Sequence, residues 1–114
     1  MRTIRVIGNL EPGGGQLSAL RLGTALAKRG WGLRFLVGSA TAEGVELFRS
    51  HGVEVEVYGA RRSLQYECDE GFSTWLAARL AGADLVHVHQ FGAWWATARG
   101  APAGVPVVGS EHNA

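Results

Sequence analysis

The chain has 114 residues, 46% of them hydrophobic and 18% charged, which fits one compact domain or part of one. Its 11 Lys and Arg residues nearly balance its 10 Asp and Glu residues, so the net charge of +1 gives no electrostatic reason to expect nucleic acid or an anionic membrane as a partner. A single cysteine excludes a disulfide framework, no apolar run reaches the length of a membrane span and the N-terminus lacks a secretory pattern, so we expect a soluble cytoplasmic protein.

Short β-branched runs alternate along the chain with segments whose apolar residues recur at helical spacing. In chain order the pattern predicts a strand over 2–8, a loop over 9–15, a helix over 16–29, a strand over 33–37, a short helix between Thr41 and Gly52, a strand over 53–58, a polar stretch over 61–70, a helix from Phe72 to about Gly82, a strand over 84–89, a short helix over 94–99 and a strand over 105–111. Helices between strands predict a parallel sheet, because parallel neighbours need long right-handed connections.

The third predicted strand, residues 53–58, alternates apolar and charged side chains with period two. Strands buried in the middle of a parallel sheet usually read as continuous apolar runs, so this strand is expected at an edge with its charged face toward water. That placement favours the strand order 3-2-1-4-5. The predicted fold class is therefore an α/β, doubly wound parallel sheet.

Three segments are expected to meet where the strand order reverses, because ligands of open α/β sheets bind beyond the carboxyl ends of the strands. They are Gly13–Gln16 after the first strand, His89–Phe91 after the fourth and Glu111–Asn113 after the fifth. The glycine run precedes a predicted helix, where free N–H groups and the helix dipole favour an anion such as a phosphate. The alternative is a flexible connection that only turns the chain.

Other cofactor motifs are incomplete in this loop. A dinucleotide fingerprint beginning at Gly13 would need a glycine where Ser18 stands, and a Walker-type loop needs a Gly-Lys pair, whereas the only lysine is Lys28. Ordinary NAD and P-loop chemistry are therefore disfavoured. A metal held by His87, His89 and His112 is also disfavoured, because no thiolate accompanies them.

Several further side chains could have either a structural or a functional role. His87 and His89 are two residues apart and point to one face of their strand. His87 is expected to be a packed, hydrogen-bonded residue, and His89, at the strand end, is expected to face the crevice. For Trp94 and Trp95, core packing is favoured over stacking on a sugar or lipid, although one of the pair can be exposed. Cys68 is expected to pack as a small residue rather than act as a nucleophile.

Taken together, three segments resemble the N-terminal domain of glycosyltransferase family 4. They are Pro12-Gly13-Gly14-Gly15-Gln16 with the helix that follows, Ala83 to His89, and Gly104 to Asn113. The resemblance implies a Rossmann-like domain, the first of two in a GT-B fold. It also implies a retaining enzyme that moves a sugar from a nucleotide-diphosphate sugar to an acceptor hydroxyl.

The resemblance also implies roles for individual residues. Gly14 and Gly15 are similar to the glycines that approach the donor diphosphate or sugar, and Gln16 is similar to an acceptor contact. His112 is similar to the histidine beside the reacting centre. The expected site is thus His112 as the catalytic residue and, as residues that bind donor or acceptor, Gly13, Gly14, Gly15, Gln16, His89, Glu111 and Asn113.

In the family, a second domain binds the nucleotide and neutralises the diphosphate. The resemblance therefore implies that residues 1–114 are the acceptor-side domain of a truncated enzyme and that the chain alone transfers no sugar, with the missing domain, the nucleotide sugar and a hydroxyl acceptor as its partners. No metal or other cofactor is expected, and membrane contact only if the acceptor is lipid-linked. Two alternatives stay open, a non-catalytic binding module and a small-nucleotide-binding domain.

Overall fold

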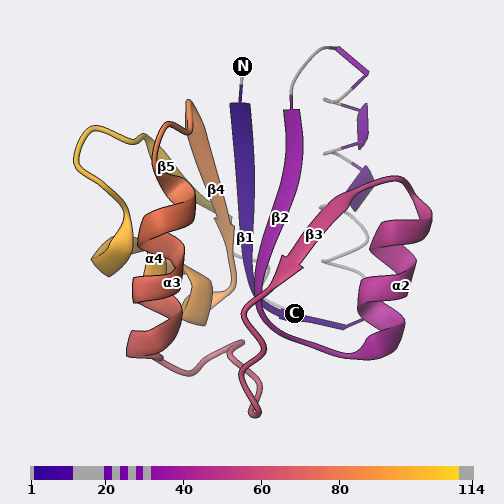
Figure 1. The fold of residues 1–114 in the computed structure, drawn as a ribbon, viewed down its shortest axis with the longest axis horizontal. Coiled ribbons are helices and arrows are strands. Elements are labelled where there is room, and N and C mark those ends of the chain that lie inside the picture. Colours follow the sequence, from indigo (N-terminus) through magenta and orange to yellow (C-terminus); the bar gives the residue numbers. More distant parts are fainter. Residues whose placement is uncertain (1, 12–19, 22–23, 26–27, 30–31, 111–114) are drawn as a thin grey trace.

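The computed structural model describes residues 2–11, 20–21, 24–25, 28–29 and 32–110, and its central feature is a parallel five-stranded sheet (Figure 1). The elements are β1 (Arg2–Leu10), β2 (Gly32–Ala40), α2 (Ala42–Ser50), β3 (Glu54–Val57), α3 (Glu70–Leu80), β4 (Leu85–His89), α4 (Phe91–Gly100) and β5 (Val107–Ser110). The strand order is β3-β2-β1-β4-β5, with every neighbouring pair parallel. The predicted Rossmann-like fold class, the strand order and the edge position of the third strand are confirmed.

Helices cover both faces of the sheet, with α3 and α4 on one face and α2 on the other (Figure 1). On the first face the buried side chains of β1, β2 and β4 pack against both helices, around Phe72, Leu76 and Ala96. On the second face, Phe48 of α2 meets Phe35 of β2 edge to face, with ring centroids 5.0 Å apart. The central strands are thus buried on both faces and carry most of the apolar core.

Local capping fixes where α2 and α3 begin. The Thr41 hydroxyl accepts a hydrogen bond from the Gly44 N–H at 3.1 Å, as the sequence predicts for the start of α2. The Asp69 carboxylate accepts one from the Phe72 N–H at 2.8 Å and caps α3. Helix α2 is followed by Gly52, whose φ of 76° is a left-handed conformation that favours glycine.

Several element boundaries differ from the sequence prediction. Asn9 and Leu10 belong to β1 rather than to a loop, because both pair with β2 and both are buried. Strand β2 continues to Ala40, and α4 begins at Phe91 instead of Trp94. Strand β5 begins at Val107, two residues later than predicted, while its predicted end at Glu111 lies outside the described residues.

The first predicted helix, residues 16–29, is described only in part. Leu20, Arg21, Thr24 and Ala25 are helical, and the Thr24 hydroxyl donates to the Leu20 carbonyl oxygen at 2.8 Å. Lys28 donates its backbone N–H to the Thr24 carbonyl oxygen at 3.2 Å. The described residues of this segment therefore agree with the predicted helix. Among the helices that the structure describes, none is long and apolar enough to cross a bilayer.

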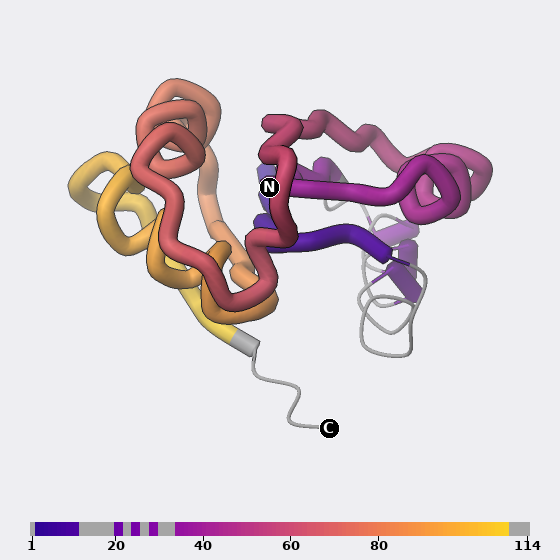
Figure 2. Tube along the Cα trace, turned by 90° about the horizontal axis from the view of Figure 1, so that it is seen from below, coloured from indigo at the N-terminus to yellow at the C-terminus, as the bar shows by residue number. Residues whose placement is uncertain are grey.

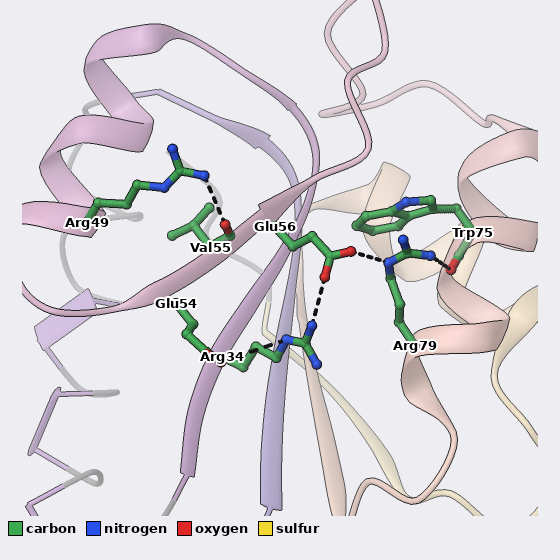
Figure 3. Close-up of polar contacts among 7 residues, drawn as sticks. All are labelled: Arg34, Arg49, Glu54, Val55, Glu56, Trp75 and Arg79. Carbon is green, nitrogen blue, oxygen red and sulfur yellow. Dashed lines mark hydrogen bonds and ion pairs between the residues drawn. The ribbon is translucent and has the colours of Figure 1, made fainter.

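The alternation predicts that the charged face of the edge strand β3 is open to water. In the structure, part of this face is covered by ion pairs. Glu56 accepts a hydrogen bond from Arg34 of β2 at 2.7 Å and another from Arg79 of α3 (Figure 3). The Arg79 guanidinium also lies over the Trp75 ring, 4.1 Å from its centroid. The Arg79 hydrogen bond, followed by the charges of both arginines, holds the pKa of Glu56 below its usual value. This ion-pair network joins the sheet edge to α3.

Candidate functional site

The carboxyl ends of all five strands lie along one edge of the sheet, and the strand order reverses between β1 and β4. Strand β1 connects onward to β2 on one side, and β4 connects onward to β5 on the other. Connections that leave in opposite directions create a crevice at this switch point, where open α/β sheets bind ligands. The candidate site is therefore built from the residues that end β1 and β4 and from the loops that approach them.

The segment that follows β3, residues 59–69, crosses this edge on its way to α3 (Figure 2). Its one fully buried apolar side chain is Leu64. A Cβ atom added to Gly8 or Gly92 would lie 2.3 or 1.7 Å from the Leu64 carbonyl oxygen, and one added to Gly38 would lie 2.8 Å from Leu64 Cδ1. The segment packs so closely on the strand and helix ends that three glycines are required beneath it.

A chain of hydrogen bonds connects this segment to β1, β2 and β4. The Leu64 N–H donates to Ser39 Oγ at 2.9 Å, and Ser39 Oγ donates to Asn9 Oδ1 at 2.7 Å. Asn9 Nδ2 donates to Glu11 Oε1 at 2.7 Å, and the Asn9 N–H donates to Gln90 Oε1 at 2.7 Å. Asn9 and Ser39 are buried, so this network fixes polar groups at the switch point instead of leaving them to water.

Gln90, between β4 and α4, has an unusual backbone conformation with φ 76° and ψ 153°. Side chains disfavour this region of φ and ψ strongly enough that it is essentially reserved for glycine. Every other positive-φ residue in the described part of the chain is a glycine. The strained residue therefore stands at the point where the two halves of the sheet diverge.

A buried cation lies below the switch point, in the middle of β1. The Arg5 side chain is 2% exposed, and its Nη1 atom donates to His87 Nδ1 at 2.8 Å and to His89 Nε2 at 3.2 Å. The two imidazole rings lie 4.4 Å apart, centroid to centroid. Because an arginine only donates, these ring nitrogens must be unprotonated acceptors. Burial lowers the pKa of Arg5.

The structure reverses the expected burial of the two histidines, because His89 and not His87 is the more buried. His89 is buried, with 6% of its surface exposed, whereas His87 is half-buried. Since β4 ends at His89, the side chain was expected to open toward the crevice, but its hydrogen bond to Arg5 turns it to the interior. Its role in binding donor or acceptor stays a prediction.

An open cavity of about 460 Å³ lies at the carboxyl end of β3. It is lined by Tyr58, Gly59, Ala60, Arg61, Arg62 and Asp69. The Tyr58 hydroxyl donates to Asp69 at 3.2 Å, and burial together with the Asp69 charge raises the pKa of Tyr58. Arg62 lies 3.8 Å from Asp69 and 3.5 Å from Glu67, so acidic side chains balance part of the cavity's positive charge.

Most of the predicted site residues lie outside the described part of the chain. These are Gly13, Gly14, Gly15, Gln16, Glu111, His112 and Asn113, whose meeting at one crevice stays a prediction. Sequence reasoning missed Asn9 and Ser39, and it placed Gln90 at the crevice within residues 89–91 without giving it an individual role; the structure brings these three residues together. The available signal was small residues beside strand ends, because Gly8 directly precedes Asn9 and Gly38 directly precedes Ser39.

Two smaller expectations need correction. Cys68 is exposed, because the 59–69 segment turns Leu64 rather than Cys68 toward the core. Trp94 is 55% exposed, while its neighbour Trp95 packs partly against the core, so core packing holds for one of the pair. Among the described residues, no three His, Cys, Asp or Glu side chains are grouped as metal ligands would be.

Comparison with known protein families gives a match. Residues 12–114 match the family model of Glycosyltransferase Family 4, which spans most of the chain. No curated protein and no solved structure matches the chain. The match agrees with the Rossmann-like sheet, and it associates the domain with glycosyl transfer. The chain belongs to Glycosyltransferase Family 4.

Proposed function

We propose that this domain is the acceptor-side half of a retaining glycosyltransferase with a GT-B arrangement of two domains. The observation that carries the proposal is a family match over residues 12–114 combined with an ordered polar network at the switch point of the sheet. The hydrogen-bonding groups fixed there, together with the open cavity at the end of β3, suit a hydroxyl-rich acceptor.

In this proposal the bond between the anomeric carbon and the diphosphate oxygen breaks, and a bond from the acceptor oxygen to the anomeric carbon forms. The acceptor loses its hydroxyl proton, and the nucleoside diphosphate leaves with the bonding electron pair. Holding the acceptor oxygen against the anomeric carbon supplies much of the rate enhancement, since well-oriented reactants gain up to about 7–11 kcal/mol. This domain would supply that orientation for the acceptor.

The remaining roles follow the family resemblance. Gly14 and Gly15 let the donor diphosphate or the transferred sugar approach the backbone, and Gln16 contacts the acceptor. His112 lies beside the reacting centre, with Glu111 and Asn113 next to it in sequence. A second domain binds the nucleotide and neutralises the leaving diphosphate, a contribution that is commonly larger than any other.

The test uses the protein expressed from its complete reading frame. Release of nucleoside diphosphate is measured with UDP-glucose, GDP-mannose and related donors, with and without hydroxyl acceptors. The proposal expects acceptor-dependent release. His112→Ala is expected to lower turnover more than it weakens donor binding. His51→Ala, the same change at an exposed histidine after α2, serves as the matched control.

Two results would contradict the proposal in different ways. If no donor yields acceptor-dependent release, the domain does not serve glycosyl transfer. If His112→Ala turns over like the His51→Ala control, transfer stands but His112 has no part in it.

A further inference from the structure

The side chain of Gln90 is held in one orientation by its neighbours. Its Oε1 atom accepts the Asn9 N–H at 2.7 Å, so the oxygen faces β1 and the NH₂ group faces away. Within the described part of the chain, no hydrogen bond uses Gln90 Nε2 as a donor, and the side chain is half-buried rather than covered. Two N–H donors are therefore presented at the switch point in a fixed direction.

Two N–H groups at the start of α4 already have acceptors within the protein. The Gly92 N–H already donates to the Gln65 carbonyl oxygen at 2.9 Å, and the Trp94 N–H donates to the Gln90 carbonyl oxygen at 3.1 Å. The loop and the helix itself thus use these two N–H groups, whereas the Gln90 Nε2 group donates to no described residue. The backbone conformation at Gln90 also indicates a role for its side chain, because glycine would adopt this conformation without strain but would provide no carboxamide.

The charge beside Gln90 indicates which ligand this carboxamide suits. Glu11, at the end of β1, is linked to Gln90 through Asn9, which donates to both side chains. A neutral N–H donor near a carboxylate suits a hydroxyl group, which accepts from the first and donates to the second.

We propose that Gln90 is a substrate-binding residue that donates a hydrogen bond to a hydroxyl oxygen of a neutral polyol, with the Glu11 carboxylate as the partner acceptor. This inference rests on the proposed function, because a glycosyl acceptor or transferred sugar is such a polyol. Gln90 then sets specificity by selecting a substrate that has a hydroxyl at that position, since a donor that the bound substrate covers without offering an acceptor loses binding energy.

The experiment titrates the ¹⁵N-labelled 114-residue chain with methyl α-D-glucopyranoside, methyl α-D-mannopyranoside and myo-inositol, and separately with inorganic phosphate. The side-chain NH₂ resonances of Gln90 are followed by NMR, and intermolecular NOEs to the polyol are sought. A saturable shift with at least one polyol, with NOEs to the Gln90 amide protons and no response to phosphate, is expected.

The matched variants are Gln90→Glu and Gln65→Glu. Gln90→Glu keeps an acceptor for the Asn9 N–H but removes both donors, so the Kd for the polyol should rise about tenfold or more. Gln65, a neighbour whose carboxamide donates to the Tyr66 hydroxyl at 3.2 Å, undergoes the same chemical change. Its variant should bind within about twofold of the wild type. Thermal unfolding checks that both variants fold.

Three results would overturn the inference. They are the absence of any polyol-induced shift at Gln90 in the wild-type chain, equal polyol affinity in folded Gln90→Glu, and a Gln90 response to phosphate in place of a polyol. The wild-type titration needs no variant, so a misfolded Gln90→Glu leaves the inference testable. Acceptor-dependent turnover without a Gln90 response refutes this inference alone, whereas a Gln90 response without turnover refutes the transferase proposal alone.

Discussion

Replacing Gly92 by alanine tests the close approach that builds the switch point. The new Cβ would lie 1.7 Å from the Leu64 carbonyl oxygen and 2.9 Å from the Glu67 carbonyl oxygen. Both atoms belong to backbone, which cannot rotate away as a flexible side chain would. The 59–69 segment therefore has to retreat from α4 by roughly an ångström or more before normal van der Waals contact is restored.

The expected loss follows from what that retreat breaks. Two hydrogen bonds weaken, from the Gly92 N–H to the Gln65 carbonyl and from the Leu64 N–H to Ser39 Oγ, each contributing about 1 kcal/mol. Displacing the Leu64 side chain from its buried position adds part of the roughly 2–5 kcal/mol typical of a buried leucine. Alanine recovers about 1 kcal/mol of helix propensity. The net decrease in the free energy of unfolding is about 3 kcal/mol.

Urea unfolding followed by far-UV circular dichroism measures this decrease. Gly52→Ala is the matched control, because Gly52 has φ 76° and no atom within 4 Å of its added Cβ. Its decrease should therefore reflect backbone strain alone, about 1–2 kcal/mol. In a double-mutant cycle, Gly92→Ala and Leu64→Ala should be less than additive, because both displace the same side chain. A Gly92→Ala protein as stable as the wild type, or full additivity in the cycle, would refute the reasoning.

Three further predictions concern single side chains. The Arg79 hydrogen bond holds the folded pKa of Glu56 below its unfolded value of about 4.3, so the free energy of unfolding of the wild type should fall as the pH drops from about 4.3 through the folded pKa. Glu56→Gln should flatten this fall, which urea unfolding at several pH values measures. Burial raises the pKa of Tyr58 above its unfolded value of about 10, so the free energy of unfolding of the wild type should fall as the pH rises past about 10, and Tyr58→Phe should remove that dependence. At neutral pH the same variant should lose about 1 kcal/mol of free energy of unfolding, because it lacks the hydrogen bond to Asp69. Thr41→Ala should lower the free energy of unfolding by about 1 kcal/mol by leaving the Gly44 N–H uncapped, and Thr41→Ser should retain most of it.

The order of the strands could be predicted because one strand differs in pattern from the others. The alternation Val53-Glu54-Val55-Glu56-Val57 marks a strand with one apolar face, and the remaining strands lack this strict alternation with charged residues. Strand ends were less predictable, because Asn9 and Ser39 look like loop residues. Both lie in the β1–β2 ladder, where their polar side chains are satisfied by each other at 2.7 Å. Tertiary hydrogen bonding overrode local propensity there.

The candidate site was harder to predict because it depends on a segment without periodicity. Residues 61–70 are polar and mixed, and one leucine among them gives no helical or strand pattern. Leu64 becomes the buried contact of that segment only through the glycines beneath it, which lie in three different elements. The left-handed backbone at Gln90 likewise has no local cause in the sequence, since glutamine does not favour it.

The strain at Gln90 persists because its surroundings determine its backbone from three directions. The residue before it, His89, is fixed in the ladders of β4 with β1 and β5, and the α4 residues after it are anchored by buried Ala93 and Ala96. Its own carboxamide is held by the Asn9 N–H. An unfavourable conformation of this kind costs about 1–3 kcal/mol. Gln90→Gly would relieve that strain while removing both the Asn9 acceptor and the outward N–H donors, so a strained glutamine is expected to be retained only where its side chain is used.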